Sequence, residues 1–322
     1  MNAKTIGVLT SGGDSPGMNA AVRSVVRTAL GKGMKVIGIR RGYNGLIKRD
    51  LMEMNLRSVS DIIHRGGTVL YTARSPEFKT EEGMATAIQT CNDLGIDGIV
   101  CIGGDGTYRG AHDLSKRGIP CVGVPGTIDN DIASTEYSIG FDTAINTCME
   151  MVDRLRDTAQ SHERCTIVEV MGRQAGYMAL HSGIATGATA ILVPEVECDL
   201  ERDIIAKMRK TQLSGKKHFI IIVAEGVGHV EELAKQIEGI TGIESRATIL
   251  GHVQRGGSPS VRDRVTASEM GHHAVELLDA GKGNRVVAMQ KSQIVDFDIF
   301  EALKMKKPFE YDLYRIANEI SI

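Results

Sequence analysis

Short runs of apolar, often β-branched residues alternate with segments of helical spacing throughout the first half of the chain. Runs with the length of buried strands lie at residues 5–10, 34–39, 98–102 and 120–124. Segments with the apolar spacing of amphipathic helices lie at 20–30 and 84–94. This alternation predicts a mostly parallel sheet with helices on both faces, in which ligands bind at the carboxyl ends of the strands.

The same alternation restarts after a long amphipathic helix that we predict at about 144–159. Further strands are predicted at 166–171, 190–193, 218–223 and 246–252, and further helices at 175–185, 201–210 and 261–280. The restart predicts an α/β fold of two doubly wound lobes with an active site in the cleft between them. The first lobe would comprise residues 1–139 and 251–304, and the second residues 140–250 and 305–322. No low-complexity linker marks the boundary near residue 140.

Composition narrows the class of protein. The 322 residues are 42% hydrophobic and 24% charged, which is typical of a soluble globular protein, and no apolar run is long enough to cross a bilayer. The formal net charge of −2 argues against nucleic-acid binding through bulk charge. The first residues lack a signal-peptide pattern, and the six cysteines include no C-x-x-C pair. We therefore expect a cytoplasmic protein with reduced core cysteines, rather than cysteines with a redox or metal role.

Three glycine-rich segments follow predicted strands, at residues 11–19, 103–107 and 125–131. Glycine lets a backbone approach a phosphate closely, and carboxylates such as Asp105, Asp129 and Asp131 can hold Mg²⁺ or accept a proton from a hydroxyl. The segment at 11–19 precedes a helix but matches neither the P-loop nor the Rossmann fingerprint, so a plain strand-to-helix turn would also explain it. Taken together, the three segments predict phosphoryl transfer.

The intervening segments are predicted as loops and one short helix. Residues 40–45 are expected to form a loop, residues 58–61 to cap a short helix, and residues 72–76 to form an exposed loop that carries Arg74. A single loop arginine is ordinarily solvated, so Arg74 would have a binding role only if a phosphate lies nearby.

Several separated motifs together resemble those of the bacterial ATP-dependent 6-phosphofructokinase family. The motifs are GGDGT at 103–107, PGTIDND at 125–131, MGR at 171–173 and GHVQRGG at 251–257, with further matches at 7–19 and 160–164. The first motif alone is also found in NAD kinases and lipid kinases, whereas the combination is specific. The resemblance extends from about residue 4 to about residue 310.

The resemblance implies that the chain transfers a phosphoryl group from ATP to fructose 6-phosphate, giving fructose 1,6-bisphosphate. It implies that Asp129 is the general base and that the catalytic group also includes Thr127, Arg173 and Gly13. The residues it assigns to ATP are Gly13, Arg74, Ser75, Gly104, Asp105, Gly106 and Thr107. For Mg²⁺ it implies Asp105 as a ligand, with Asp131 beside the metal site.

The resemblance also implies a sugar site that is completed by a neighbouring subunit of a homotetramer. The residues it assigns to fructose 6-phosphate within one subunit are Thr127, Ile128, Asp129, Met171, Gly172, Arg173, Glu225, His252, Val253, Gln254 and Arg255. It implies that Arg164 and Arg246 reach the 6-phosphate from the neighbouring subunit.

An effector site for ADP and phosphoenolpyruvate is implied as well. Its lining would comprise Arg23, Arg27, Asp61, Arg156, Lys216, Lys217 and His218. This chain departs from the family pattern at Thr189, where a glutamate is usual, at Ser214, where a basic residue is usual, and at Leu56–Arg57, which replaces an Arg-Tyr pair. We therefore expect allosteric regulation with an altered effector response.

Pyrophosphate is the alternative phosphoryl donor, and a regulatory subunit or another kinase is the alternative to this activity. Pyrophosphate-dependent relatives typically carry Asp and Lys where this chain has Gly106 and Gly126, so two glycines favour ATP. A nucleotide-binding regulatory subunit without chemistry would be expected to lose Asp105, Asp129 or Asp131, and all three are present. An NAD kinase or lipid kinase would lack the motifs at 125–131 and 251–257.

Overall fold

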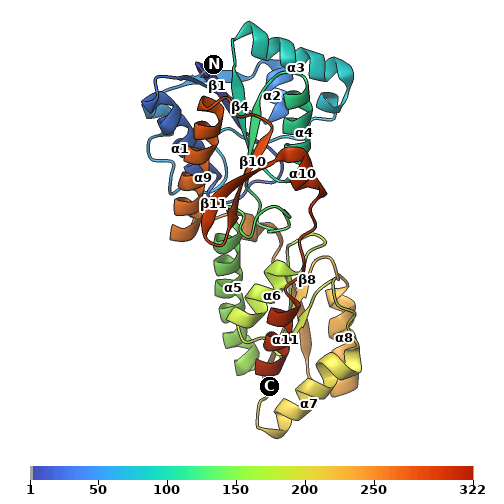
Figure 1. Ribbon diagram of the computed structural model, residues 1–322. Helices are drawn as coiled ribbons and strands as arrows, with labels where there is room; N and C mark the ends of the chain where they lie inside the picture. Colours follow the sequence, from blue (N-terminus) through green and yellow to red (C-terminus); the bar gives the residue numbers. More distant parts are fainter. Residues whose placement is uncertain (1–2, 322) are drawn as a thin grey trace. The chain divides into compact units, whose positions relative to one another are not determined.

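The computed structural model describes residues 3–321 as two compact units, each built from separate stretches of the chain (Figure 1). Unit 1 comprises Met1–Ile128, Ile132–Thr143 and Arg255–Lys307. Unit 2 comprises Asp129–Asp131, Ala144–Gln254 and Pro308–Ile322. Residues 129–131 thus group with unit 2, whereas the sequence led us to expect them in the first lobe.

Unit 1 contains a seven-stranded sheet in the order β11-β10-β5-β4-β1-β2-β3. Its strands are β1 (Thr5–Thr10), β2 (Lys35–Ile39), β3 (Leu51–Met54), β4 (Gly98–Gly103), β5 (Cys121–Pro125), β10 (Arg285–Gln290) and β11 (Gln293–Asp298). Only the edge strands β3 and β11 run antiparallel to their neighbours. The predicted mostly parallel sheet is confirmed.

Helices cover both faces of this sheet because its central strands β1, β4 and β5 are buried along nearly their whole length. In β4 all six residues are buried, so successive side chains pack on opposite faces. The helices α1 (Met18–Gly31) and α9 (Val261–Asp279) share one core with Val8 and Val100. The opposite core lies under α2 (Tyr43–Lys48), α3 (Glu81–Asp93), α4 (Asp105–Lys116) and α10 (Ile299–Lys304). Two short 3₁₀ helices, η1 (Leu56–Val59) and η2 (Glu77–Lys79), complete the unit.

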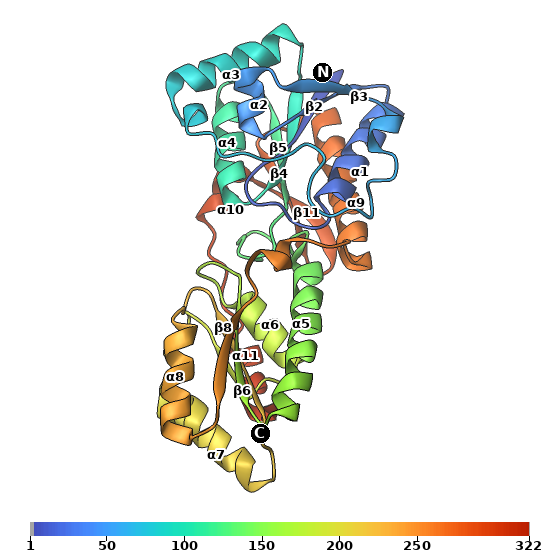
Figure 2. The same cartoon turned by 180° about the vertical axis from the view of Figure 1, so that it is seen from behind.

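Unit 2 contains a four-stranded parallel sheet in the order β7-β8-β6-β9. Its strands are β6 (Cys165–Val170), β7 (Ala190–Leu192), β8 (Phe219–Ala224) and β9 (Ser245–Ile249). One face packs against η3 (Leu200–Ile205), α7 (Ala206–Leu213) and α8 (Val230–Thr241). The other face carries α5 (Phe141–Ser161), α6 (Tyr177–Ala185) and α11 (Tyr311–Ile320), as Figure 2 shows. A 3₁₀ turn, η4 (Gly251–Arg255), follows β9.

Several local predictions are wrong, and each has a physical reason. Residues 43–45, predicted as part of a loop, begin the helix α2, because Tyr43 stacks on Phe78 and its hydroxyl donates to the carbonyl of Thr107. Residues 58–61 begin no helix; Asn55 is the N-cap of η1, where its side chain accepts from Arg57 N and Ser58 N, and Ser58 Oγ accepts in return from Asn55 N at 3.1 Å.

Four further predictions need correction. Residues 105–107 form the first turn of α4 rather than a loop. The helix predicted at 201–210 begins as a π-helical turn, η3, and the strand predicted at 246–252 ends at residue 249. Five cysteines are buried and free as expected, but Cys198 is exposed and so is not a core residue. Within residues 3–321, no helix combines the length and the hydropathy needed to cross a bilayer.

Candidate active site

The carboxyl ends of β1 and β4 form the centre of the site in unit 1. The chain passes from β1 to β2 on one side of β1, whereas β4 pairs on its other side, so the strand order reverses between β1 and β4. Such a reversal leaves a crevice at the carboxyl ends of the strands, where ligands of α/β sheets bind. The two loops are tied together, since Ser11 N donates to Ile102 O at 2.9 Å and Thr107 Oγ1 donates to Ser11 O at 3.1 Å.

The loop after β4 places a carboxylate at the start of a helix. Gly104 is the N-cap of α4, and the exposed Asp105 and Gly106 form its first turn. A side chain at Gly103 would collide with Ser11 O, which explains why glycine is needed where the two loops touch. In contrast, a β-carbon at Gly106 would meet no atom within 4 Å. The first turn of α4 is therefore open to an anion, which the helix N-terminus favours.

An arginine lies directly against the glycine loop that follows β1. A β-carbon at Gly13 would overlap Nη1 of Arg255, so the absence of a side chain there lets the guanidinium approach the backbone. Nε of Arg255 is buried and has no hydrogen-bond partner among residues 3–321. The structure thus brings Gly13 and Arg255 together in unit 1, although the resemblance assigns Gly13 to ATP and Arg255 to the sugar. Arg74 is exposed, and Ser75 Oγ accepts from Phe78 N at 3.4 Å.

A buried carboxylate that the sequence did not indicate supports the loop carrying Thr127 and Ile128. Asp263 on α9 is fully buried and accepts from Tyr137 Oη at 2.5 Å, Gly140 N at 2.7 Å and Thr143 N and Oγ1. Burial raises the pKa of Asp263, while these hydrogen bonds act in the opposite direction. Residues 137–143 in turn hold Thr127, since Thr127 N donates to Ile139 O at 3.2 Å and Ser138 Oγ donates to Thr127 O at 2.9 Å.

In unit 2, the carboxylate of Asp129 pairs with the guanidinium of Arg173. Arg173 Nε lies 3.1 Å from Asp129 Oδ2, and the Asp129 side chain is 2% exposed whereas that of Arg173 is 60% exposed. Arg173 and Asn130 both have left-handed backbone conformations, with φ of 55° and 50°. For a residue other than glycine, this backbone conformation costs free energy, so the surrounding structure must hold Asn130 and Arg173 in it.

The arginine is presented by a loop at the second reversal of strand order, between β6 and β9. Met171 N donates to Gln254 Oε1 at 2.9 Å, and Arg173 N donates to Glu225 Oε1. Gln254 is fully buried and also bonds Met178 Sδ at 2.7 Å, so its amide supports the 171–173 loop from within. His252 and Val253 are exposed. Unit 2 therefore brings together Asp129, the 171–173 loop, Glu225 and Gln254 at the carboxyl ends of its strands.

Two predicted phosphate-binding arginines lie at the amino-terminal ends of the strands of the same sheet, opposite the 171–173 loop. Arg164 precedes β6 and Arg246 is near the start of β9, whereas Met171 and Gly251 follow those strands. Both arginines bind the carboxylate of Glu244, with Arg164 Nε at 2.6 Å and Arg246 Nη2 at 2.5 Å. The six residues of β6 span about 20 Å. Within one subunit, Arg164 and Arg246 therefore cannot contact a ligand held at Met171.

The predicted effector residues fall into two groups. Arg23 and Arg27 lie one turn apart on α1 in unit 1, and burial together with the charge of Arg27 lowers the pKa of Arg23. In unit 2, Lys216 Nζ lies 3.4 Å from Thr189 Oγ1. Burial, with the charges of Lys216 and Arg156, lowers the pKa of His218. Lys217 instead pairs with Glu163 at 2.7 Å, and Asp61 is exposed in unit 1.

The two carboxylates predicted for Mg²⁺ lie in different units: Asp105 belongs to unit 1 and Asp131 to unit 2. Across residues 3–321, no group of three or more His, Cys, Asp or Glu side chains could hold a metal ion. An exposed carboxylate at the anion-binding end of α4 still fits Mg²⁺, because that ion is commonly held by one or two carboxylates together with substrate phosphates and water.

Comparisons with known proteins agree with this geometry. A family model described as Phosphofructokinase matches residues 5–278. The chain is 56% identical over 318 residues to a Clostridium botulinum protein named ATP-dependent 6-phosphofructokinase, and the match covers 99% of each chain. It is similar to the structure of phosphofructokinase from Saccharomyces cerevisiae, with a TM-score of 0.88 and 34% identity over 99% of this chain and 48% of that one. A pyrophosphate-dependent phosphofructokinase from Marinobacter aquaeolei has a TM-score of 0.85 over 99% of this chain and 91% of that one, but at 23% identity the likeness shows the fold alone.

Proposed function

The chain belongs to the phosphofructokinase family, and from that membership we propose that it transfers the γ-phosphoryl group of ATP to the 1-hydroxyl of fructose 6-phosphate. The products are ADP and fructose 1,6-bisphosphate, as in the glycolytic reaction of the family, and we place the enzyme in the cytoplasm. The observation that carries this proposal is the buried carboxylate of Asp129 held by Arg173 beside the 171–173 loop.

Asp129 is suited to act as the general base. Its carboxylate would accept the proton of the 1-hydroxyl as that oxygen attacks the γ-phosphorus and the bond to the β-phosphate oxygen breaks. Arg173 would have two roles. It orients the Asp129 carboxylate, and its largely exposed guanidinium can donate to the transferring phosphoryl group. Gly13 and Arg255 would add donors for the developing charge in unit 1.

We propose that unit 1 binds the nucleotide, through Gly13, Arg74, Ser75 and residues 104–107, and that unit 2 contributes most of the sugar site. Asp105, at the start of α4, would hold Mg²⁺ jointly with the nucleotide phosphates. When bound, the ion supplies positive charge that neutralises the phosphate oxygens. The open space beside Gly106 favours ATP over pyrophosphate, because no side chain occupies the region next to the phosphate loop.

The positions of Arg164 and Arg246 support a sugar site that is shared between subunits. If these arginines bind the 6-phosphate, they must act on the sugar held at Met171 of another subunit, since the two groups lie at opposite edges of one sheet. From family membership we propose that the subunits form a homotetramer. Mixing Asp129→Ser subunits with Arg246→Ser subunits, each inactive alone, would restore part of the activity by forming intact shared sites; no recovery after subunit exchange would contradict the shared site.

We further propose that ADP and phosphoenolpyruvate act at a retained but altered effector site. Arg156 and Lys216 bring positive charge beside His218, and Lys216 lies next to Thr189, which brings no carboxylate to this cluster. Fructose 6-phosphate saturation curves with and without each effector test this point. Activation and inhibition at the strength usual for the family would refute the altered response.

A direct comparison of phosphoryl donors tests the activity itself. We expect turnover with ATP and fructose 6-phosphate in a coupled assay, and little with pyrophosphate at the same concentration. A preference for pyrophosphate would favour the alternative enzyme, a pyrophosphate-dependent phosphofructokinase, and failure with both donors would refute the proposal.

A further inference from the structure

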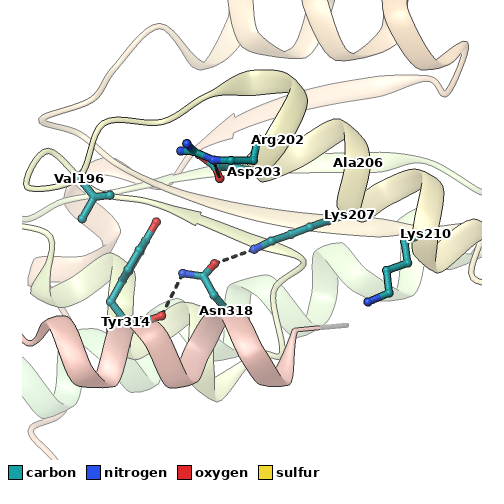
Figure 3. A pocket seen from close by; sticks show the side chains of 8 residues that line it. All are labelled: Val196, Arg202, Asp203, Ala206, Lys207, Lys210, Tyr314 and Asn318. Atoms are coloured by element: carbon teal, nitrogen blue, oxygen red, sulfur yellow. Dashed lines mark hydrogen bonds and ion pairs between the residues drawn. The ribbon is translucent and has the colours of Figure 1, made fainter.

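A cavity of about 470 Å³ lies in unit 2 between α11 and the consecutive helical segments η3 and α7 (Figure 3). It is lined by Val196, Arg202, Asp203, Ala206, Lys207, Lys210, Tyr314 and Asn318. None of these residues belongs to the predicted catalytic, sugar or effector sets. Its volume falls in the range of cavities that bind small molecules. We call it the α7–α11 pocket.

The pocket has an excess of positive charge. Arg202 is neutralised by Asp203, since its Nε and Nη2 donate to the two carboxylate oxygens at 2.7 and 2.8 Å. No carboxylate among residues 3–321 lies within ion-pair distance of Lys207 or Lys210. The only hydrogen-bond partner of the Lys207 ammonium in that range is the neutral Asn318 Oδ1, at 2.6 Å. The charge of Asp203 also acts on Lys207, but the lining still holds three cationic side chains, Arg202, Lys207 and Lys210, against this one carboxylate.

Lys207 is held in place rather than free in solvent. It is half-buried, and it donates to the side-chain oxygen of Asn318. The Asn318 side chain is itself oriented, because its Nδ2 donates to Tyr314 O at 3.0 Å within α11. Burial lowers the pKa of Lys207, which means that the charged ammonium is poorly solvated there. An ammonium has three N–H donors and Asn318 takes one, so two remain for an anionic ligand.

The rest of the lining suits a flat or apolar group. Tyr314 is half-buried, and its hydroxyl donates to Ile191 O at 3.1 Å, which anchors the ring at the pocket wall. Figure 3 shows the Tyr314 ring and Asn318 projecting from α11 toward the segment that carries Arg202 and Lys207. Val196 and Ala206 add apolar surface. The wall therefore offers a carbon-bearing ligand contacts that an inorganic ion would not use.

We propose that the α7–α11 pocket is a binding site for a small organic phosphate, whose phosphate is held by Lys207 and Lys210 and whose carbon body lies along Tyr314. A phosphate monoester carries a charge of about −1.5 to −2 at neutral pH, which matches the two lysines. The site is separate from the kinase chemistry and does not depend on it.

Phenyl phosphate tests this site in the full-length enzyme, with ADP and fructose 6-phosphate present at saturation so that their own sites are filled. We expect saturable binding by isothermal titration calorimetry with a Kd on the order of 1 mM. Lys207→Gln should weaken binding by about 10-fold, because a charge-assisted contact is lost. Lys210→Glu, at an exposed position that should not affect folding, should weaken it at least as much. Lys235→Glu on α8 is the matched control and should leave the Kd unchanged.

Two ligand controls identify what the pocket recognises. Phenol should not bind, and inorganic phosphate should bind several-fold more weakly than phenyl phosphate. Kinase turnover of the Lys207 and Lys210 variants should equal that of the unmodified enzyme, so the test is independent of the proposed reaction. No saturable binding, equal binding by inorganic phosphate, or a Kd unchanged in both lysine variants would overturn the proposal.

Discussion

Replacing Asp263 with Asn should destabilise unit 1 and displace the loop that carries Thr127. The carboxylate accepts five hydrogen bonds, from Tyr137 Oη and Gly140 N on one oxygen and from Thr143 N, Thr143 Oγ1 and, at 3.5 Å, Ser260 Oγ on the other. An amide in the same position keeps one acceptor but presents an NH₂ donor where the second oxygen was. The Thr143 amide N–H would then face another donor in a fully buried site.

The magnitude follows from these contacts. One buried N–H left without a partner costs about 1–3 kcal/mol, and each bond weakened by loss of the negative charge costs about 1 kcal/mol more. Removing the charge also relieves the desolvation that raises the pKa of Asp263, which offsets part of the loss. We expect a net destabilisation of about 2–4 kcal/mol, which corresponds to a fall in Tm of roughly 5–15 °C.

Differential scanning fluorimetry and amide hydrogen exchange measure the two consequences separately. The Tm should fall, and the Gly140 and Thr143 amides should lose protection. Because residues 138 and 139 hold Thr127 through its N–H and its carbonyl, kcat should fall while nucleotide binding stays nearly constant. Asp279→Asn on the same helix is the matched control; Asp279 pairs with Lys32 at the surface, so we expect a loss of at most about 1 kcal/mol. A Tm within 1 °C of the unmodified enzyme in Asp263→Asn, with unchanged protection, would refute this account of the site.

Four further predictions concern the candidate sites. Asp129→Ser should lower kcat by about 10²–10⁴ while fructose 6-phosphate still binds, and near-normal turnover would remove Asp129 from the role of base. Gly106→Asp should reduce turnover with ATP without lowering the Tm, because its β-carbon meets no atom within 4 Å; unchanged ATP kinetics would show that this glycine does not select the donor. Thr189→Glu should strengthen the response of the fructose 6-phosphate saturation curve to ADP, since it adds a carboxylate beside Lys216, and an identical response would contradict the effector assignment. Burial in the folded state keeps the pKa of His218 below its usual value of 6.5. Its contribution to stability is therefore present above about pH 6.5 and is lost as the pH falls through the lower folded pKa. His218→Gln should flatten the dependence of Tm on pH in that acidic range, and an unchanged slope would contradict this account.

The sequence alone was sufficient for the fold class and for the motifs. Apolar runs such as residues 98–102 must be buried on both faces, and a strand buried on both faces needs helices on each side, which leads directly to a doubly wound sheet. The glycines at 103 and 104 and the acidic residues that follow predicted a phosphate site because few other residues permit such a close backbone approach. Local patterns of this kind depend only on neighbours along the chain.

Elements that depend on distant partners were missed or wrong. Residues 43–48 lack a strong helical pattern, and their helix is stabilised by the contact of Tyr43 with Phe78, 35 positions along the chain. Residues 56–59 form a 3₁₀ helix through the side chain of Asn55, in a register that the sequence does not reveal. Cys198 stands between two acidic residues, Glu197 and Asp199, and lies in an exposed segment, unlike the five buried cysteines.

The sequence by itself determined which residues could carry the chemistry: the glycine loops, Asp105, Asp129 and Arg173. Only the tertiary structure decided how they are held. It pairs Asp129 with Arg173, closes the 171–173 loop on the buried amide of Gln254, and uses Asp263, which no motif contains, to support residues 137–143. It also places Arg164 and Arg246 on the opposite edge of the sheet from Met171. The physical reason is that a motif fixes the type of a side chain, whereas hydrogen bonds and ion pairs require atoms within about 3 Å. Residues that are far apart in the sequence, such as Gly140 and Asp263, reach that distance only when the chain has folded.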